Sequence, residues 1–347
     1  MRLFATCTSA RTVKRIIVLA VILSAVILGY SLSVRKPRVS PSSNSEVDGI
    51  TRKQSIFRKV EIARDLPFDV NKDVFTPLNI PKTGTPALID HIIHNSDIQP
   101  RCRFSNGKGY RCLSPTNSTW LLDYTTEKSQ GSLCRPNSDW TELTECVEAR
   151  FDENDSRRAQ PTYRYITLLR DPLQRFISEF LRTKKLFKWP DMNICQGQFP
   201  SQQDLWDCSE GPRNLTLGRY LSCRSNLAIN RQTRMLADLR LVNCYNETGM
   251  SEEERDRKLL ESAKENLLKM SYFGLTDYQH LSQAVFEKTF HVKFLSDFEQ
   301  FNVTRASKAA IAPSDLERIA KVNHNDVELY IFAKSLLMER ARYMNIH

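Results

Sequence analysis

Two short stretches of the chain carry side chains that could hold an anion. In the first, Lys82 is followed by Thr83, Gly84 and Thr85. A loop of this kind before a helix offers a cation, backbone N–H groups and the positive end of the helix dipole to a phosphate. The spacing differs from the Gly-x4-Gly-Lys-Ser/Thr loop of nucleotide triphosphatases. We therefore predict an anion loop of another kind, with a plain turn and a solvated lysine as the alternative.

The second stretch is built around Arg170, with Ser178 two turns into the helix that should follow. The planar fork of an arginine matches phosphate oxygens. Asp171 is placed to cap that helix and Pro172 to open it. An arginine paired with a surface carboxylate is the alternative interpretation of this stretch.

The elements around both stretches predict an α/β sheet. Residues 163–169 form an aromatic and β-branched run of strand length, and the next apolar residues have helical spacing through Leu181. Residues 74–80 and 87–93 repeat this strand–loop–helix pattern. In an open α/β sheet, ligands bind beyond the carboxyl ends of the strands. Lys82 and Arg170 are both expected there.

These stretches resemble the heparan sulfate 6-O-sulfotransferases. Lys82-Thr83-Gly84 is similar to the 5′-phosphosulfate loop of sulfotransferases, and Arg170 with Ser178 is similar to their 3′-phosphate site. The resemblance covers most of residues 72–345 in the family's order. It continues through residues 139–143, 165–179, 226–228, 230–232, 234–239, 244–246, 273–276 and 304–306.

The resemblance implies a P-loop-like sulfotransferase fold with a central parallel sheet flanked by helices. It also implies 3′-phosphoadenosine 5′-phosphosulfate as the sulfate donor, heparan sulfate as the acceptor, sulfate transfer to the 6-hydroxyl of glucosamine, and no metal. Lys82 would hold the bridging oxygen, and the backbone of Thr83, Gly84 and Thr85 would surround the 5′-phosphate. Residues implied to close over the nucleotide are Phe298, Gln300, Thr304 and Arg305.

The acceptor is expected next to the donor-binding helix. Arg182 and Trp189 match family positions that contact the glycan, and Lys184 and Lys188 lie beside them. A tryptophan can lie against a sugar face, and basic side chains can pair with carboxylate or sulfate. A surface loop is the alternative. Lys108 is a weaker acceptor candidate.

One departure from the family concerns the catalytic base. The family's base is the histidine of Cys-Gly-Leu-His-Ala-Asp-Trp, and Asn137 stands at that position. A second departure, Asn79-Ile80-Pro81 in place of His-Ile-Gln, keeps the cation of the donor loop. An amide cannot accept a proton at neutral pH. Either Asp139 or Glu142 serves instead, or the chain is a catalytically weak or inactive glycan-binding relative.

The N-terminal region predicts a membrane anchor. Residues 16–34 are 19 uncharged residues rich in Ile, Val and Leu, long enough to cross about 30 Å of hydrocarbon. A cleaved signal peptide would have a shorter apolar core. We predict a cytoplasmic tail over residues 1–15, a signal anchor over 16–34, a flexible stem over 35–70 and a lumenal sulfotransferase domain over 71–347.

Sequons and cysteines indicate a cytosolic N-terminus and a catalytic part in an oxidising lumen, and with the resemblance we predict a single-pass type II Golgi membrane protein. Five Asn-x-Ser/Thr sites and eight of the nine cysteines follow the predicted anchor. The net charge of +10 falls to +3 when residues 1–38 are removed, because 43 basic then face 40 acidic residues. Global charge therefore does not argue for a polyanionic partner, and we expect no nucleic-acid partner.

The lumenal cysteines occur in close couples, which favours nearest-neighbour pairing. The predicted pairs are 102–112, 134–146, 195–208 and 223–244. A zinc site is the alternative, but the sequence has no Cys-x2-Cys. Towards the C-terminus, the pattern predicts a helix over 258–270, a strand over 272–276, a helix over 281–290, and two helices over 313–343 broken near 323–325.

Overall fold

The computed structural model describes residues 65–105, 109–122, 135, 137–154, 161–186, 194–198, 215–223, 226–299 and 304–346. The predicted tail, anchor and most of the stem lie outside these residues. Among the described residues, no helix is both long and apolar enough to span a bilayer. The folded part begins earlier than predicted, because Leu66 donates its backbone N–H to Thr289 and Phe68 stacks on Phe75 with ring centroids 4.0 Å apart.

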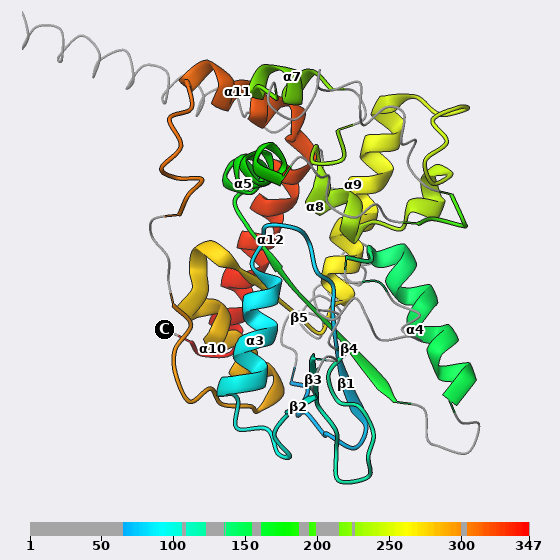
Figure 1. Cartoon of the computed structure of the whole chain (residues 1–347), viewed down its shortest axis with the longest axis vertical. Helices are drawn as coiled ribbons and strands as arrows, with labels where there is room; N and C mark the ends of the chain where they lie inside the picture. The colour runs from blue at the N-terminus through cyan, green and yellow to red at the C-terminus, as the bar shows by residue number, and fades with distance from the viewer. Residues whose placement is uncertain are drawn as a thin grey trace, which may run out of the picture. The chain divides into compact units, whose positions relative to one another are not determined.

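A parallel three-stranded sheet forms the centre of the fold (Figure 1). It consists of β1 (Asp73–Pro77), β4 (Thr162–Leu169) and β5 (Tyr272–Leu275), in the order β1-β4-β5. Asp73 pairs with Thr162, and Ile166 pairs with Tyr272. The four C-terminal residues of β4 are buried, as are all residues of β5. The predicted parallel sheet and its strands are confirmed.

Each strand leads into a helix, as the periodicity predicted. Helix α3 (Thr85–Asn95) follows β1, and α5 (Pro172–Leu186) follows β4. A 3-10 turn, η3 (Thr276–Tyr278), joins β5 to α10 (Gln279–Phe290). Asp171 caps α5 by accepting a hydrogen bond from the Gln174 backbone N–H at 2.9 Å. The two predicted closing helices are α11 (Pro313–Val322) and α12 (His324–Tyr343).

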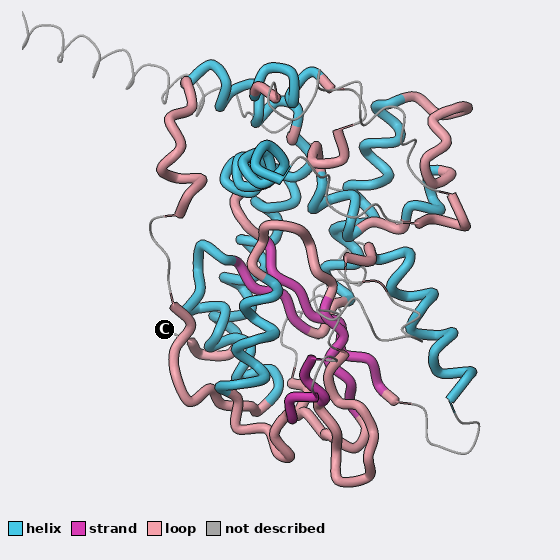
Figure 2. The backbone as a smooth tube through the Cα atoms, in the orientation of Figure 1, coloured by secondary structure: helices cyan, strands magenta, loops and turns pink. Residues whose placement is uncertain are grey.

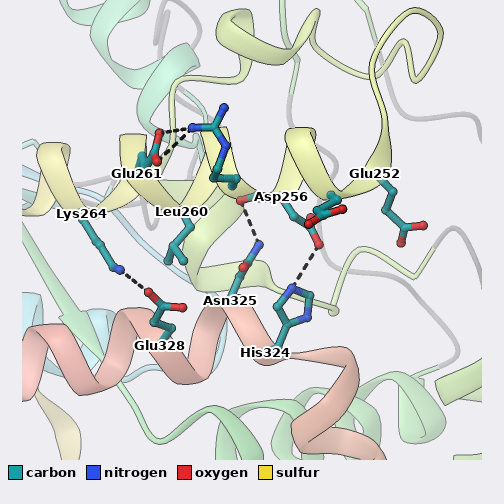
Figure 3. A pocket seen from close by; sticks show the side chains of 10 residues that line it. Glu252, Asp256, Leu260, Glu261, Lys264, His324, Asn325 and Glu328 are labelled. Atoms are coloured by element: carbon teal, nitrogen blue, oxygen red, sulfur yellow. Dashed lines mark hydrogen bonds and ion pairs between the residues drawn. The ribbon is translucent and has the colours of Figure 1, made fainter. Parts of the chain in front are cut away.

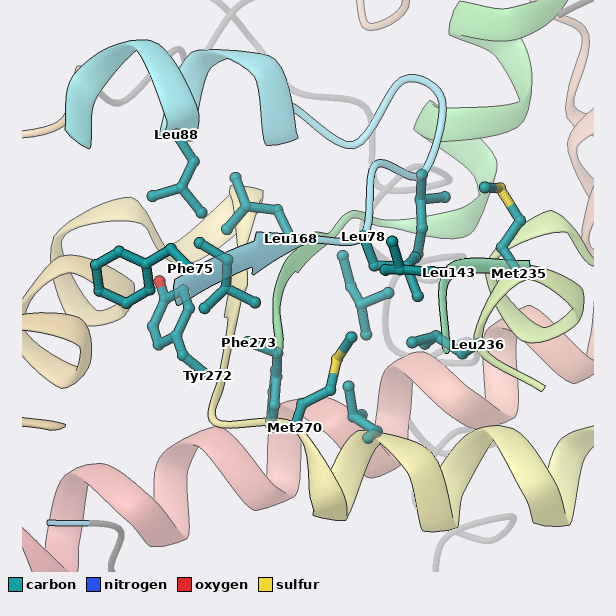
Figure 4. Packing of buried hydrophobic residues seen from close by; sticks show 14 of the residues in the cluster. Phe75, Leu78, Leu88, Leu143, Leu168, Met235, Leu236, Met270, Tyr272 and Phe273 are labelled. Atoms are coloured by element: carbon teal, nitrogen blue, oxygen red, sulfur yellow. The ribbon is translucent and has the colours of Figure 1, made fainter. Parts of the chain in front are cut away.

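The sheet lies between helical layers. Figure 4 shows α3 on one face of the strands and α9 (Glu252–Lys269) with α12 on the other. Phe75, Phe273 and Leu168 are at most 2 % exposed between these layers. The remaining described elements are β2 (Arg103–Ser105), β3 (Gly109–Arg111), α4 (Trp140–Asn154), α7 (Leu217–Ser222), α8 (Arg231–Leu236) and η2 (Leu239–Val242).

A second, smaller core packs α5 against α7 and α11. Its buried side chains include Phe176, Phe180, Tyr220 and Ile319. Figures 1 and 2 show α7 and α11 side by side at one end of the molecule, next to α5. This packing fixes the direction of α5, and therefore of the arginine that precedes it.

The cysteine pairing is partly as predicted. Cys102 is bonded to Cys112, as expected. Cys195 is bonded to Cys244, so the predicted pairs 195–208 and 223–244 are wrong. The fold brings residues 49 positions apart to a Cα separation of 5.6 Å, and sequence proximity does not encode such an approach. Cys146 and Cys223 are also disulfide-bonded. The predicted 134–146 pair lies outside the described residues because Cys134 does.

Candidate functional site

The loop from Ile80 to Thr85 is a tight turn at the carboxyl end of β1. Lys82 and Gly84 have positive φ angles of 72° and 98°. The Thr83 hydroxyl donates to the Ile80 carbonyl at 2.8 Å and holds the turn closed. Glycine tolerates its left-handed conformation without the Cβ clash that an L side chain meets. The loop therefore meets the first turn of α3, where backbone N–H groups lack helical partners.

A single side chain joins this loop to the two neighbouring strands. The hydroxyl of Thr276, just after β5, lies within hydrogen-bonding reach of the Thr83 carbonyl oxygen and lies 3.1 Å from the carbonyl oxygen of Leu169. Leu169 is the last residue of β4. The carboxyl ends of β1, β4 and β5 thus meet at one edge of the sheet, where we expected the ligand.

Arg170 follows the last residue of β4 at this edge, and two contacts hold its guanidinium in place. Its Nη2 donates to the Thr304 hydroxyl at 3.1 Å, and its Nη1 lies 3.4 Å from the Lys82 carbonyl oxygen. Burial lowers the pKa of the Arg170 guanidinium, against the opposing effects of Asp277 and Asp171. The predicted residues Lys82, Arg170 and Thr304 are therefore in one place.

Four basic side chains converge around the loop. Burial lowers the pKa of the Lys82 ammonium, and the positive charges of Arg182, Arg170 and Arg305 lower it further, with Glu179 opposing them. Partly buried like charges destabilise one another unless an anion neutralises them. This cluster, which we call the basic edge (Lys82, Arg170, Arg182 and Arg305), is thus electrostatically complementary to a multiply charged anion.

Ser178 is partly buried on α5. It lies four residues before Arg182 and therefore on the same face of the helix. Since Arg182 is close enough to Lys82 to affect the lysine pKa, this face of α5 is turned towards the basic edge. The pairing of Ser178 with Arg170 around one phosphate stays a prediction.

Gln232 on α8 holds the backbone of Arg170, a role that no local sequence pattern indicates. Its Oε1 accepts from the Arg170 backbone N–H at 2.9 Å, and its Nε2 donates to the Arg170 carbonyl at 3.0 Å. Asp326 on α12 accepts in turn from the backbone N–H groups of Gln232 and Thr233, at 3.1 and 2.8 Å. The only sequence signal was membership of Gln232 in a segment that resembles the family.

A buried ion-pair network lies behind the basic edge. Glu179 on α5 accepts from Arg231 on α8 at 2.6 and 3.0 Å, and from Arg175 on its own helix. All three side chains are at most 3 % exposed. Burial alone would raise the pKa of Glu179, but the positive charges of Arg231 and Arg175 have the larger effect, so the pKa lies below its ordinary value. The network fixes α5 against α8.

The residue at the position of the family's base lies near the end of β1. Asn137 accepts a hydrogen bond through its Oδ1 from Nδ2 of Asn79, at 2.8 Å. Two amides, both at positions where the family has histidine, thus face each other. The base itself is not supplied by either side chain, because a neutral amide does not accept a proton.

Both carboxylates proposed as substitute bases have structural partners. Asp139 is fully buried and caps α4 by accepting from the Glu142 backbone N–H at 2.9 Å. Glu142 forms a two-pronged ion pair with Arg135 at 2.6 and 2.7 Å, and Ile194 donates its N–H to the same carboxylate at 3.3 Å. Both carboxylates are thus engaged in holding α4 and the loop before it.

Of the remaining predicted site residues, the structure describes only Phe298. Phe298 is buried against His91 and Phe294, with ring centroids 4.3 and 5.2 Å away, and so packs on α3. Lys108, Trp189 and Gln300 lie outside the described residues, as does Lys188. Among the described residues, no group of three or more potential metal ligands occurs.

Figure 3 shows a separate cavity between α9 and α12, of about 670 Å³. Its lining is dominated by carboxylates, several of them paired. Asp256 lies 3.3 Å from His324, and Lys264 lies 2.5 Å from Glu328. The residues that line it are Glu252, Glu253, Asp256, Arg257, Leu260, Glu261, Lys264, His324, Asn325 and Glu328. An anionic donor or glycan does not fit this charge.

Comparison with known proteins gives a consistent assignment. A family model described as the sulfotransferase family matches residues 69–333. The chain is 39 % identical over 296 residues to chicken heparan-sulfate 6-O-sulfotransferase 2, covering 83 % of this chain and 73 % of the relative. It is 40 % identical to human heparan-sulfate 6-O-sulfotransferase 1, covering 84 % of this chain and 72 % of the relative.

A longer relative shows the same similarity over a smaller share of its length. Human heparan-sulfate 6-O-sulfotransferase 3 is 40 % identical over 293 residues, which cover 82 % of this chain and 62 % of the relative. The family model's match over residues 69–333 includes the whole of the described sheet and the basic edge.

Proposed function

Because the chain belongs to the sulfotransferase family, we propose that it transfers a sulfuryl group from 3′-phosphoadenosine 5′-phosphosulfate to the 6-hydroxyl of glucosamine residues in heparan sulfate. The basic edge is the structural observation that carries the proposal. It gathers Lys82, Arg170, Arg182 and Arg305 at the carboxyl end of a parallel sheet. The names of the relatives supply the acceptor.

The donor's two phosphate groups match two parts of the site. The loop around Thr83, Gly84 and Thr85, with α3 behind it, offers backbone N–H groups for the 5′-phosphate. Arg170, with Ser178 on the helix that follows, offers charge and a hydroxyl for the 3′-phosphate. Thr304 accepts a hydrogen bond from Arg170, and the neighbouring Arg305 is close enough to lower the pKa of Lys82. Donor chemistry supplies an activated sulfate, and these residues bind and orient it.

Transfer requires that charge moving onto the leaving phosphate be held in place. In the reaction, the bond between the sulfur and the 5′-phosphate oxygen breaks, a bond from the sulfur to the sugar oxygen forms, and the hydroxyl proton leaves. The ammonium of Lys82 would stabilise the bridging oxygen as it becomes negative. Arg182 lies on α5, close enough to Lys82 to lower the pKa of the lysine. Its guanidinium can therefore hold a carboxylate or sulfate of the acceptor.

We also propose a type II membrane topology with the catalytic domain in the Golgi lumen. The support is the uncharged run of residues 16–34, the five sequons that follow it, and the disulfides Cys102–Cys112 and Cys195–Cys244. Disulfides form and persist in oxidising compartments. Protection of the sequon-bearing part from protease in sealed Golgi vesicles, with loss of protection in detergent, is the expected result.

The activity test uses the detergent-solubilised full chain with labelled donor and desulfated heparan sulfate, followed by disaccharide analysis. We expect label at the 6-position of glucosamine. Arg170→Ala should reduce binding of the 3′,5′-bisphosphate product by about 100-fold, since hydrogen bonds between charged groups contribute about 1.5–3 kcal/mol. Arg257→Ala, an exposed arginine on α9, is the matched control. Label confined to another position of the disaccharide would overturn the assignment of the acceptor hydroxyl.

The alternative, a weakly catalytic glycan-binding relative, rested on Asn137 alone. Nothing in the comparisons favours it, because the named relatives are all enzymes of one activity.

A further inference from the structure

The side-chain amide of Gln174, in the first turn of α5, has an unsatisfied oxygen. Its Oε1 atom is buried, and no hydrogen-bond donor contacts it in the part of the chain that the structure describes. The backbone of the same residue is fixed, because its N–H donates to the Asp171 carboxylate at 2.9 Å. Buried side-chain oxygens nearly always have a partner, and one without a donor costs the fold free energy. A buried acceptor in this state suits a ligand that brings a hydrogen-bond donor.

Gln174 belongs to a row of side chains on α5. Ser178 follows it by one helical turn, and Arg182 follows Ser178 by another. Residues four positions apart lie on the same side of an α-helix, about 6 Å from each other along its axis. Arg182 is close enough to Lys82 to lower the pKa of the lysine. The row therefore lies on the side of α5 that is turned towards the basic edge.

A second segment passes the same end of α5. Thr304 accepts a hydrogen bond from Nη2 of Arg170, two residues before the helix begins, at 3.1 Å. Ala306 is 3 % exposed in the smaller core, and Leu173, next to Gln174 in the chain, packs against that core. Gln174 is thus close to both segments to which we assign the 3′ end of the donor, the start of α5 and residues 304–306.

The sulfate donor carries two kinds of group that can donate a hydrogen bond to this oxygen. Its phosphates and its sulfate are ionised and accept hydrogen bonds, which leaves the 2′-hydroxyl of the ribose and the 6-amino group of the adenine. The 2′-hydroxyl is on the carbon next to the one that bears the 3′-phosphate. With that phosphate at Arg170 and Ser178, the 2′-hydroxyl is the donating group nearest to Gln174.

We infer that Gln174 binds the ribose of the donor, with its Oε1 accepting a hydrogen bond from the 2′-hydroxyl. The inference rests on the proposed function and extends it from the phosphates of the donor to its sugar. A site built to bond a hydroxyl rejects an analogue that lacks it, because the buried acceptor is then left unpaired. The site should therefore distinguish a ribonucleotide from its 2′-deoxy analogue.

The test compares the binding of adenosine 3′,5′-bisphosphate and 2′-deoxyadenosine 3′,5′-bisphosphate to the detergent-solubilised full chain by calorimetry. The parent should bind the ribonucleotide about 10-fold more tightly, which corresponds to about 1.4 kcal/mol and is typical of one hydrogen bond. Gln174→Met removes the amide and keeps an unbranched side chain of similar length. The two affinities of this variant should agree within about twofold, because neither nucleotide finds an acceptor there.

Stability separates a binding role of Gln174 from a structural one. Because its Oε1 has no partner among the described residues, Gln174→Met should leave the free energy of urea unfolding unchanged or raise it. Gln99→Met, which removes an exposed glutamine amide beyond the end of α3, is the matched control and should keep the parent's preference for the ribonucleotide. A Gln174→Met variant that is less stable and binds both nucleotides more weakly by the same factor would overturn the inference. So would a parent that binds the two nucleotides equally.

A third nucleotide distinguishes the ribose from the base. Inosine 3′,5′-bisphosphate keeps the 2′-hydroxyl and has an oxygen in place of the 6-amino group. Gln174→Met should leave the ratio of adenosine to inosine affinities as it is in the parent. If the variant lost that ratio and kept the preference for ribose over deoxyribose, the amide would contact the base, and the ribose contact would be wrong.

The ribose contact and the proposed function can fail separately. A parent that binds neither bisphosphate and places no label on heparan sulfate would overturn the proposed function, and the ribose contact with it. A parent that places label at the 6-position of glucosamine and binds the ribose and deoxyribose forms equally would overturn the ribose contact alone.

Discussion

The donor side and the acceptor side of the site are built differently. On the donor side, Arg170 is fixed at its backbone by Gln232 and at its side chain by Thr304, and Asp326 fixes Gln232 in turn. On the acceptor side, Asn137 and Asn79 hold each other through one hydrogen bond at 2.8 Å, and neither can take a proton. The proposed donor side is thus held by contacts from several elements, whereas the proposed acceptor side has two amides that cannot titrate.

This difference separates binding from chemistry. Changes on the donor side should alter donor affinity and stability, whereas changes at Asn137 should alter turnover with little effect on donor affinity. Variants that move both quantities together would contradict the separation.

The largest effect is expected at the acceptor side. If no other group acts as the base, Asn137→His should raise kcat by about 100-fold or more, because a positioned general base contributes about 100- to 10,000-fold. The Asn79 amide can turn so that its oxygen accepts from Nδ1–H of the new imidazole, which leaves Nε2 as the base. The measurement is single-turnover sulfate transfer at saturating donor.

Asn137→Gln is the control, since it retains an amide and should not raise turnover. The gain in Asn137→His should appear as pH rises through the imidazole pKa, near its ordinary value of about 6.5. A variant with unchanged kcat and an unchanged pH profile would show that another group already serves as the base.

The next effect concerns the network behind the donor side. Glu179→Gln should lower the free energy of unfolding by about 3–5 kcal/mol, because Arg231 loses the buried carboxylate it pairs with and Arg175 retains the more distant Asp326, at 3.8 Å. Glu261→Gln, which breaks an exposed pair on α9, should change it by less than about 0.5 kcal/mol. Urea unfolding of both variants at neutral pH provides the comparison.

The same pair of proteins gives a pH test with a defined sign. The pKa of Glu179 is lowered below its ordinary value of 4.5. Its ionised form therefore stabilises the fold above that value, and the contribution is lost as pH falls through the lowered pKa. The parent and Glu179→Gln should become equally stable in acid. If the difference in free energy of unfolding between the two proteins stayed constant across that pH range, the ionisation of Glu179 would not be the source of the stabilisation.

Sequence was sufficient for what local pattern encodes. The alternation and helical spacing around residues 163–181 predicted β4 and α5, and the loop chemistry at Lys82 and Arg170 predicted the sheet edge that the structure brings together. Such features depend on residues within a few positions of one another.

Contacts between distant segments could not be predicted in the same way. Gln232 reaches Arg170 across 62 positions and Asp326 reaches Gln232 across 94, and neither residue type is unusual for a helix. The prediction for Cys195 failed for the same reason. Disulfide pairing follows spatial approach, whereas nearest spacing predicted the pair 195–208 in place of Cys195–Cys244. The engagement of Glu142 with Arg135 likewise depended on how a loop folds onto α4.

A smaller effect tests how Gln232 positions Arg170. Gln232→Leu should weaken binding of the 3′,5′-bisphosphate product by about 10-fold and binding of adenosine 5′-monophosphate by less than about twofold, because only the first carries a 3′-phosphate for Arg170. Calorimetry with both nucleotides measures the ratio. Gln232→Glu is a second variant, which keeps the acceptor for the Arg170 N–H and should retain part of the selectivity. Equal weakening for both nucleotides would indicate a general loss of structure.

The smallest effect concerns the charge of Lys82. Burial, with Arg182 and Arg170, lowers the pKa of its ammonium below the ordinary 10.5, so the positive charge is lost at a lower pH than in a free lysine. Affinity for the bisphosphate product should therefore already fall in the alkaline range below pH 10.5. Bound phosphate favours the charged form, so binding in that range should take up protons, which calorimetry in two buffers of different ionisation enthalpy detects. Lys82→Arg, which stays charged, should remove both the decline and the uptake, and their persistence in that variant would assign them to a different group.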